Sequence, residues 1–345
     1  MTYMAEEIRQ APEVIDRLLV EGRPAIRAAA RAFADANPTW IAIAARGTSD
    51  HAAIYARYLI EAILGLPVVL TAPSIDTVYG RRSDWSGGLL LSISQSGESP
   101  DLLAVVEAAK RSGCPTLTIT NQVESPLAQG SDHVIDYLAG VERSVAATKT
   151  YVASLAAIAG VVEAIDPSAG FDTGALPDLA QLTIDAAGGW VADSGVVEAF
   201  AESAGSLVVG RGYNLATASE VALKLIETSQ RFAIAYSAAD VEHGPMVLAM
   251  EQTPVLFIES PGSMGVHTRP LQQRLIAADA DLWTVATRPH SSSDANKLIL
   301  PIEVSDELSP IPLVLPGQLL AESVSRHLGF DPDSPKGLTK VTRTL

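Results

Sequence analysis

The stretch GLLLSISQSGESPDLL (88–103) decides the fold. It begins with a nearly continuous apolar run, GLLLSIS (88–94), which is typical of a parallel strand buried on both faces. The turn QSGES follows, and a helix is predicted from Pro100 to Ser112, with Ser99 at its N-cap. A buried strand, a glycine turn and a helix in this order predict one repeating unit of an α/β fold.

The same alternation extends on both sides of this stretch. Further strands are expected at WIAIAA (40–45), VVLTAP (68–73), PTLTIT (115–120) and HVIDYLA (133–139), and helices over residues 50–64 and 144–165. The first residues are also helix-spaced, with Pro12 breaking or restarting the helix. Alternating helices and buried strands predict a doubly wound, parallel, flavodoxin-like sheet.

The second half of the chain repeats the first. Arg46-Gly47 after the first strand matches Arg211-Gly212, and Gly97 matches Gly262, both 165 residues later. A shared register of glycine turns after strands predicts two α/β domains that arose by duplication, joined by a connector around 166–190 that is rich in Pro, Gly, Asp and Ala. The predicted organisation is an N-terminal helical arm (1–25), a first domain (26–170), a second domain (190–330) and a C-terminal tail (331–345) that covers the active site.

Composition excludes several classes of protein. The 345 residues carry a formal net charge of −16, and 48% are hydrophobic, which is typical of a globular chain. Nucleic-acid backbones require clustered Lys and Arg, so no nucleic-acid partner is expected. The single cysteine, Cys114, excludes an internal disulfide and a Cys-based zinc site. Neither a signal peptide nor a run of about twenty apolar residues is found, so we expect no membrane association and a cytoplasmic location.

Two serine-containing turns predict a phosphate site. The turn after strand 88–94 offers Ser94, Gln95, Ser96 and Ser99. Hydroxyls and backbone N–H groups at a helix N-terminus favour an anion, although an ordinary capped turn would also fit. Gly47-Thr48-Ser49 is a second such turn, and ligands bind at the carboxyl ends of strands in open α/β sheets. The equivalent loop of the second half, Glu259-Ser260-Pro261-Gly262, has lost this serine pattern and gained a carboxylate, so one phosphate site per chain is expected.

Acid–base residues gather in the second half. Glu220, Lys224 and Glu227 share one face of a predicted helix, which suits either proton transfer or a solvated ladder of salt bridges. His243 stands in a Glu-His-Gly-Pro turn, and histidine is a common general acid or base in enzymes, although a histidine alone is more often structural. A carboxylate, a lysine and a histidine are the groups that sugar ring opening and proton transfer between C1 and C2 require.

No signal for a cofactor or a metal is found. The other histidines have no paired metal-ligand spacing, so no metal is predicted. Neither a GxGxxG motif nor a P-loop occurs, which argues against a dinucleotide or a nucleoside triphosphate. The expected ligand is a small phosphorylated sugar, and no cofactor is expected.

Six stretches together resemble the sugar isomerase (SIS) domain family. They are ARGTSDHAA (45–53), SISQSGESPDLL (92–103), GVERSVAATKTY (140–151), ASEVALKLIETS (218–229), AADVEHGPMVL (238–248) and DPDSPKGLTKVT (331–342). They occur in the family's order and span nearly the whole chain. Within the family, the chain is similar to the isomerase portion of the glucosamine-6-phosphate synthases and to the SIS-type glucosamine-6-phosphate deaminases. The resemblance implies two tandem SIS domains.

The resemblance also implies a role for each matching residue. Glu227 would be the base that moves a proton between C1 and C2, and Lys224 would orient that region. His243 would open the sugar ring in the site of a neighbouring subunit, so a homodimer is expected. The sugar phosphate and nearby hydroxyls would be held by Gly47, Thr48, Ser49, Ser94, Gln95, Ser96 and Ser99.

Three further positions are implied near the sugar. Val145 would line it, Glu142 would place a carboxylate beside it, and Lys340 matches the lysine that forms a Schiff base with the ketose. The sequence also departs from the synthases: Arg46 and Asp50 replace a small and an aromatic residue, and Ala147 replaces a serine. It shows no N-terminal glutaminase domain with a cysteine nucleophile, so ammonia release from glutamine is not expected.

The resemblance therefore implies an amino-sugar phosphate deaminase or isomerase. The expected reaction converts glucosamine 6-phosphate to fructose 6-phosphate and ammonia by general acid–base catalysis. A fructosamine-phosphate deglycase, a galactosamine 6-phosphate deaminase–isomerase and a plain aldose–ketose isomerase remain open on the same scaffold. A non-catalytic sugar-phosphate sensor is a further alternative, but such regulators usually carry a basic DNA-binding module, which this acidic chain does not show.

Overall fold

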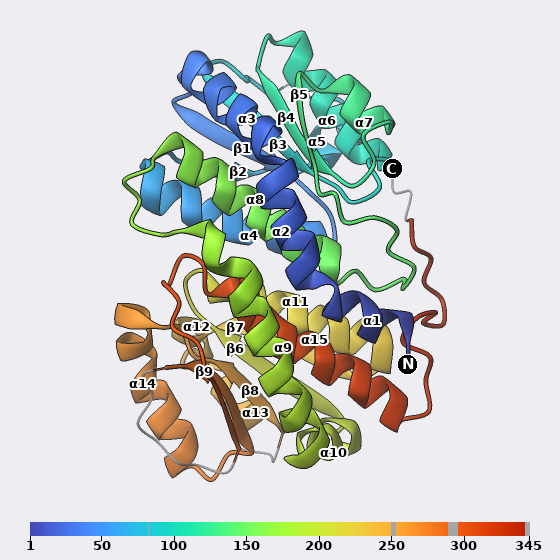
Figure 1. The fold of residues 1–345 in the computed structure, drawn as a ribbon, viewed down its shortest axis with the longest axis vertical. Helices are drawn as coiled ribbons and strands as arrows, with labels where there is room; N and C mark the ends of the chain where they lie inside the picture. The colour runs from blue at the N-terminus through green and yellow to red at the C-terminus, as the bar shows by residue number, and fades with distance from the viewer. Residues whose placement is uncertain (82, 250–252, 289–295, 342–345) are drawn as a thin grey trace. The chain divides into compact units, whose positions relative to one another are not determined.

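The chain folds into two compact units (Figure 1). The computed structural model describes all residues except 82, 250–252, 289–295 and 342–345, so the last four residues of the predicted tail lie outside the described residues. The β1–β5 unit consists of Glu13–Glu142, Lys149–Gly174 and the chain from Thr339 onward. The β6–β10 unit consists of Met1–Pro12, Arg143–Thr148 and Ala175–Leu338. Both units are α/β structures, as predicted.

A five-stranded parallel sheet forms the centre of the β1–β5 unit. Its strands are β1 (Trp40–Ala44), β2 (Val68–Leu70), β3 (Gly88–Ile93), β4 (Thr116–Thr120) and β5 (His133–Asp136). Their order is β2-β1-β3-β4-β5. The strand order reverses direction between β1 and β3, which pair in parallel with Ala44 opposite Ser92. This is the switch point at which ligands bind in doubly wound sheets.

Helices cover this sheet, and their buried faces follow the apolar spacing of the sequence. They are α2 (Ala11–Glu21), α3 (Arg23–Ala36), α4 (Thr48–Leu59) with the π-helical turn η1 (Ile60–Leu64), α5 (Ser74–Thr77), α6 (Pro100–Arg111), α7 (Pro126–Gly130) and α8 (Lys149–Ile165). On one side of the sheet Leu102, Val105 and Val106 of α6 pack against Ala42 and Leu90. The strands and helices expected in this half are therefore all present.

One helix begins later than predicted. The apolar, alanine-rich sequence indicated a helix from 144, but α8 begins at Lys149. The segment Arg143–Thr148 belongs to the other unit instead. The carboxylate of Glu142 accepts hydrogen bonds from the backbone N–H and the hydroxyl of Thr150, at 3.1 and 2.8 Å, in the first turn of α8. This carboxylate satisfies a helix-start N–H group that has no partner within the helix.

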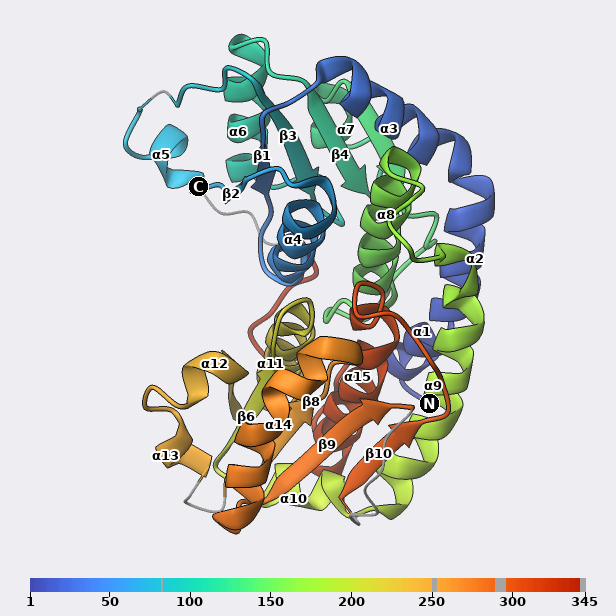
Figure 2. The ribbon, with the colours of Figure 1, turned by 90° about the vertical axis from the view of Figure 1, so that its left-hand side faces the viewer.

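The β6–β10 unit repeats the topology of the β1–β5 unit. Its strands are β6 (Gly205–Gly210), β7 (Phe232–Ser237), β8 (Val255–Ile258), β9 (Leu282–Thr287) and β10 (Lys297–Leu300). The order is β10-β9-β8-β6-β7, with all pairs parallel. Read from β7, this is the same order as in the first sheet, so the predicted duplication is confirmed at the level of topology. Figure 2 shows both sheets with their flanking helices.

The helices of the β6–β10 unit include one that the sequence analysis missed. They are α1 (Tyr3–Arg9), α9 (Leu176–Asp193), α10 (Val196–Glu202), α11 (Asn214–Ser229), α12 (Ala238–Val241), α13 (Met246–Ala249), α14 (Gly262–Ala277) and α15 (Pro310–His327). The short 3-10 helix η2 (Thr173–Ala175) precedes α9, and its first two residues belong to the β1–β5 unit. Most of the predicted connector over 166–190 is helical, because α9 begins at Leu176 and belongs to the β6–β10 unit. Pro177 fits the first turn of α9, and Leu176, Ala180 and Ile184 bury one face of it. Among the described helices, none is both long and apolar enough to cross a membrane.

Candidate functional site

The two serine turns lie at the switch point of the β1–β5 sheet. β1 and β3 are neighbouring parallel strands, so the loops that follow them leave the same edge of the sheet. Thr48 and Ser49 open α4, and Ser99 is the N-cap of α6. The N-termini of two helices therefore meet at one edge, where unpaired N–H groups and the helix dipoles favour an anion. The structure brings the seven predicted phosphate-binding residues to one place within this unit.

Internal hydrogen bonds fix the shape of the second turn. Ser94 Oγ accepts from the N–H of Gly97 at 3.1 Å, and Ser96 Oγ accepts from the N–H of Glu98 at 3.3 Å. Gly97 has a φ of +62°, and a Cβ there would lie 2.0 Å from the Ser125 hydroxyl oxygen. Only glycine fits such a position, so the turn depends on Gly97.

The hydroxyl of Ser99 is available to a ligand. Ser99 is 7% exposed, and its Oγ has no hydrogen-bond partner among the described residues. It occupies the N-cap of α6 but does not make the usual capping hydrogen bond. A buried hydroxyl without a partner is costly, and an oxygen of a bound phosphate would satisfy it. Ser99 is thus a candidate to hydrogen-bond a phosphate oxygen.

The first turn carries a charged pair beside its serine. The Arg46 guanidinium contacts the nearly buried Asp101 carboxylate at 2.7 Å, and the Arg46 side chain remains about half exposed. Burial raises the pKa of the neighbouring Asp50 carboxyl above its ordinary value, partly offset by His51 and Arg46. Arg46 and Asp50 thus place charged groups at the end of the β1–β5 unit that carries the serine turns.

Glu142 and Lys340 form a second polar centre in the same unit. The Lys340 ammonium donates to Glu142 Oε2 at 2.7 Å. The Glu142 side chain is buried, and that of Lys340 is about a quarter exposed. Because Thr150 holds the same carboxylate, the lysine is anchored to the start of α8. The structure therefore pairs two residues that the sequence placed near the sugar from nearly 200 positions apart.

Val145 lies in a segment that the β6–β10 unit holds in place. Its N–H donates to the carbonyl of Asp333 at 3.0 Å. The buried carboxylate of Glu7 accepts from the N–H groups of Arg143 and Ser144. Sequence reasoning missed Glu7, because it lies in an amphipathic helix where a glutamate is ordinarily a surface residue. Its position in the apolar register of α1, between Met4 and Ile8, was the available signal.

The face of α11 that carries Glu220, Lys224 and Glu227 is largely buried. This bears on the two interpretations of their spacing, proton transfer and a solvated ladder of salt bridges. Lys224 is 0% exposed, and its ammonium lies 3.4 Å from Glu220 and 2.5 Å from Glu227. Burial lowers the pKa of Lys224, but the two carboxylates outweigh it, so the pKa is raised above its ordinary value. The Glu227 side chain is 23% exposed. A solvated salt-bridge ladder is therefore excluded.

The pair has the form expected of a positioned base. The ammonium stays charged and fixes one oxygen of Glu227, while part of the carboxylate remains open to solvent. Such a carboxylate can take up a proton from a carbon acid without needing to reorient. Removal of the lysine would leave Glu220 as a buried, unpaired charge.

His243 is an exposed residue of the β6–β10 unit. It follows α12, and its N–H donates to the Asp240 carbonyl at 3.0 Å. Within the described part of the chain, its imidazole makes no hydrogen bond, and none joins it to Glu227. The adjacent Glu242 forms an ion pair with Arg274 of α14, which ties the turn to that helix. The His243 side chain is therefore exposed at the surface of the β6–β10 unit.

In the β6–β10 unit, the loops that correspond to the serine turns are joined by side-chain hydrogen bonds. After β6, Asn214 is fully buried and donates to the hydroxyls of Ser260 and Ser309, at 3.0 and 2.7 Å. These hydrogen bonds engage the polar side chains of that region with one another. Among the described residues, no three His, Cys, Asp or Glu side chains gather in a way that could hold a metal ion.

Comparison with known proteins defines the class of this fold. The SIS domain model matches residues 34–164 and 200–281. The chain therefore belongs to the SIS domain family, with one SIS-like domain around each sheet. It is 33% identical to the isomerizing glutamine–fructose-6-phosphate aminotransferase of Pyrobaculum aerophilum, over 98% of this chain and 57% of that protein. The chain thus spans a little more than half the length of this curated relative.

Solved structures confirm the two-domain architecture. A provisionally assigned phosphosugar isomerase of Silicibacter pomeroyi matches with a TM-score of 0.85 at 32% identity, covering 96% of this chain and all of the other. The C-terminal domain of the glucosamine-fructose-6-phosphate aminotransferase of Francisella tularensis matches with a TM-score of 0.83 at 26% identity, covering 97% and 98%. The glucosamine-6-phosphate deaminase of Thermotoga maritima shares the fold, with a TM-score of 0.81 at 19% identity over 99% of this chain and all of that one.

Proposed function

We propose that this protein is a phosphosugar deaminase–isomerase that converts glucosamine 6-phosphate to fructose 6-phosphate and ammonia. The observation that carries the proposal is the buried lysine of α11, which holds a partly exposed carboxylate, Glu227, in a fixed position. The orphaned Ser99 hydroxyl and the paired helix N-termini support a phosphate on the substrate. The family of the chain, whose relatives include isomerizing aminotransferases, supports the sugar class.

The reaction combines proton transfers with the addition of one water molecule. His243 of a partner subunit protonates the ring oxygen and opens the sugar, which makes the active protein a homodimer. Glu227 removes the proton from C2 of the aldose, and C1 is then reprotonated. This yields a ketimine at C2, and water adds to it to give fructose 6-phosphate and ammonia. Each transfer needs one positioned acid or base and no further reagent.

Lys340 offers a variant of the last step. As a free amine it would displace ammonia from the ketimine by forming a Schiff base at C2, which water then hydrolyses. The structure holds its ammonium on Glu142, so this route requires a proton to leave Lys340 first. Glu142 is the adjacent group able to take that proton.

Ammonia release from glucosamine 6-phosphate tests the proposal. We expect release by the wild type and a loss of roughly 10²- to 10⁴-fold in Glu227→Gln, the range typical of a removed general base. Ser99→Ala should weaken substrate binding by about 3- to 10-fold, since one hydrogen bond is lost. Ser92→Ala, which removes another buried hydroxyl that lacks a partner among the described residues, is the matched control and should leave binding unchanged. Equal ammonia release by Glu227→Gln and the wild type would refute the assignment.

The alternatives give different results in the same assay. A plain aldose–ketose isomerase would interconvert sugar phosphates without releasing ammonia, and a deglycase would release an amine from a fructosamine phosphate. A sensor would bind a sugar phosphate and raise the melting temperature without any turnover.

A further inference from the structure

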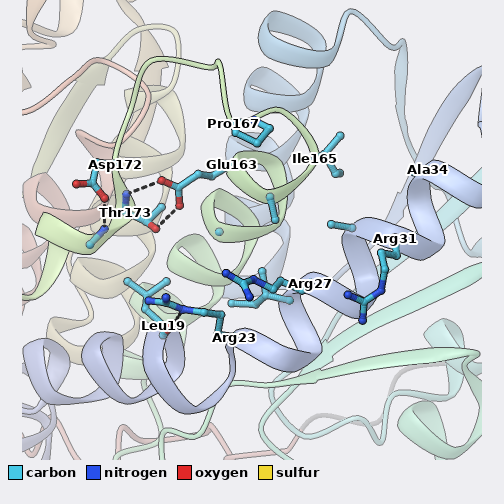
Figure 3. Close-up of a pocket in the computed structure, with 15 residues that line it drawn as sticks. Leu19, Arg23, Arg27, Arg31, Ala34, Glu163, Ile165, Pro167, Asp172 and Thr173 are labelled. Carbon is cyan, nitrogen blue, oxygen red and sulfur yellow. Dashed lines mark hydrogen bonds between the residues drawn. The ribbon is translucent and has the colours of Figure 1, made fainter.

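Three arginines line one wall of a groove in the β1–β5 unit, away from the serine turns. Arg23, Arg27 and Arg31 follow one another at four-residue spacing along α3, so they share one face of the helix. Figure 3 shows their side chains in a row along α3, with Glu163, Asp172 and Thr173 across from them. We call this the arginine groove, and its cavity volume is about 670 Å³. None of the serine-turn residues lines it.

The guanidinium groups of the arginine groove are not neutralised by the residues around them. Arg27 and Arg31 form no ion pair or hydrogen bond with any described residue, and Arg23 donates only to the Leu19 carbonyl, at 3.1 Å. The groove thus concentrates positive charge in a chain whose formal net charge is −16. Like charges on one helix face are destabilising unless something offsets them. An anion in the groove would do so.

The two carboxylates across the groove are already engaged. Glu163 accepts hydrogen bonds from the N–H and the hydroxyl of Thr173, and Asp172 accepts from the N–H of Gly174 at 2.8 Å. These contacts hold the loop that forms the far wall of the groove. They direct both carboxylates to the loop backbone, and neither reaches an arginine within ion-pair distance among the described residues. The carboxylates therefore shape the groove without cancelling its charge.

The floor of the groove is closely packed. A Cβ on Gly160 of α8 would lie 3.3 Å from Ile26 Cδ1 and 3.6 Å from Leu19 Cδ2, so α8 and α3 approach closely there. Because Gly160 has no side chain, nothing projects from α8 at this point into the space between α3 and the loop. None of the described lining residues is aromatic, so the groove offers no surface on which a nucleobase could stack.

We propose that the arginine groove binds the oligophosphate chain of a small polyanion, either free or carried on a nucleoside. Residues four apart on a helix are separated by about 6 Å along its axis, so successive phosphoryl groups can each meet a different guanidinium. Arginine forms paired, charge-assisted hydrogen bonds to phosphate oxygens, and several such contacts on one ligand reinforce one another. A single phosphate would engage only part of the row and would bind more weakly. The site is additional to the phosphosugar site and does not depend on its assignment.

Calorimetric titration with inorganic tripolyphosphate tests this proposal on the whole chain. We expect tripolyphosphate to bind more tightly than inorganic phosphate, and the double variant Arg27→Ala/Arg31→Ala to lose about tenfold or more of that affinity. Arg111→Ala is the matched control, because Arg111 is an exposed arginine of the same unit that pairs with Glu107 and does not line the groove, and the affinity of this variant should equal that of the wild type. Unchanged melting temperatures in both variants ensure that folding is not the cause.

Further measurements separate the possible sources of the signal. Equal affinity of the wild type and the double variant for tripolyphosphate would overturn the proposal and place binding at the serine turns instead. ATP binding as tightly as tripolyphosphate would support a site that recognises the phosphate chain alone, and tighter ATP binding that is lost in the double variant would support a nucleoside-borne chain. No binding of tripolyphosphate, together with a changed solution mass of the double variant, would overturn the proposal in favour of an interface between copies of this chain.

Discussion

Lys224 determines what Glu227 can do. A fully buried ammonium between two carboxylates is stable only while both partners remain, because each buried charge depends on the others for its compensation. Glu220 is as deeply buried as the lysine, whereas Glu227 is partly exposed. The arrangement therefore has one carboxylate for charge balance and one that can meet a substrate. It explains why the spacing of these three residues, read alone, fitted either a surface ladder or a catalytic face.

Replacing Lys224 tests this dependence. Lys224→Met should lower the free energy of unfolding by about 3–5 kcal/mol, because Glu220 would be left as an unpaired buried charge. Urea denaturation measures the loss. Arg57→Met is the matched control, since Arg57 of α4 pairs with Glu61 of η1 at i, i+4 spacing and both side chains are exposed, and it should change stability by less than about 1 kcal/mol. Similar losses in the two variants would show that the buried cluster is not coupled as described.

At the scale of elements, the turn between β3 and α6 carries the phosphate-binding geometry. Gly97 combines a left-handed backbone with close approach to Ser125, and both constrain the residue to glycine. The hydroxyls of Ser94 and Ser96 are used within the turn, which leaves the N-cap hydroxyl of Ser99 for the ligand.

A pair of glycine variants separates backbone strain from crowding. Gly113→Ala places a Cβ at a φ of +72° in open space, so it should cost about 1–2 kcal/mol of stability. Gly97→Ala should cost more, by about 1–3 kcal/mol for the added crowding, and should also weaken sugar-phosphate binding. Thermal unfolding and a binding titration measure the two effects. Unaltered ligand affinity in Gly97→Ala would contradict the placement of the phosphate at this turn.

The elements show what the sequence could predict and what it could not. The strands of the β1–β5 sheet were all predicted, because short, continuous apolar runs bounded by glycine turns fit few structures besides a buried strand. Strands β7 and β10 of the other sheet were not predicted. Helix α9 was missed because Pro177 and two consecutive glycines suggested a connector, whereas its buried face packs against the rest of its unit. The start of α8 was misplaced because the contacts that hold Arg143–Thr148 come from Glu7 and Asp333, which are distant in sequence. The serine turns were predictable from local pattern, whereas the Glu142–Lys340 pair came from the family resemblance.

At the scale of the whole molecule, duplication has given two units with one topology and different interiors. The loops after β6 and β8 bind each other through Asn214 and Ser260, where the loops after β1 and β3 leave Ser99 unpaired. One unit has therefore kept the features of an anion site, and the other carries the buried lysine and its carboxylates. This division suits an enzyme in which phosphate recognition and proton transfer are separate tasks.

Stability of the folded chain should depend on the charge of Asp306. Burial, reinforced by the neighbouring Glu307, raises the pKa of Asp306 from 3.8 to about 7. Because the folded-state pKa exceeds the unfolded one, the associated stability is present below about pH 4 and is lost as the pH rises through about 7. The melting temperature of Asp306→Asn should therefore fall less between pH 5 and pH 8 than that of the wild type. Asp193 is exposed, so the melting temperature of Asp193→Asn should vary with pH as that of the wild type does. The same pH dependence in Asp306→Asn and the wild type would contradict this account.

The central claim is that Glu227 moves a proton between C1 and C2 of a sugar phosphate. Incubation of the protein with fructose 6-phosphate in D₂O, followed by proton NMR at C1, tests it without any assumption about ammonia. We expect the wild type to exchange a C1 proton for deuterium and Glu227→Gln to lose roughly 10²-fold or more of that rate while still binding the sugar phosphate. Exchange at the wild-type rate in Glu227→Gln, or no exchange in a wild type that binds the sugar, would contradict the claim.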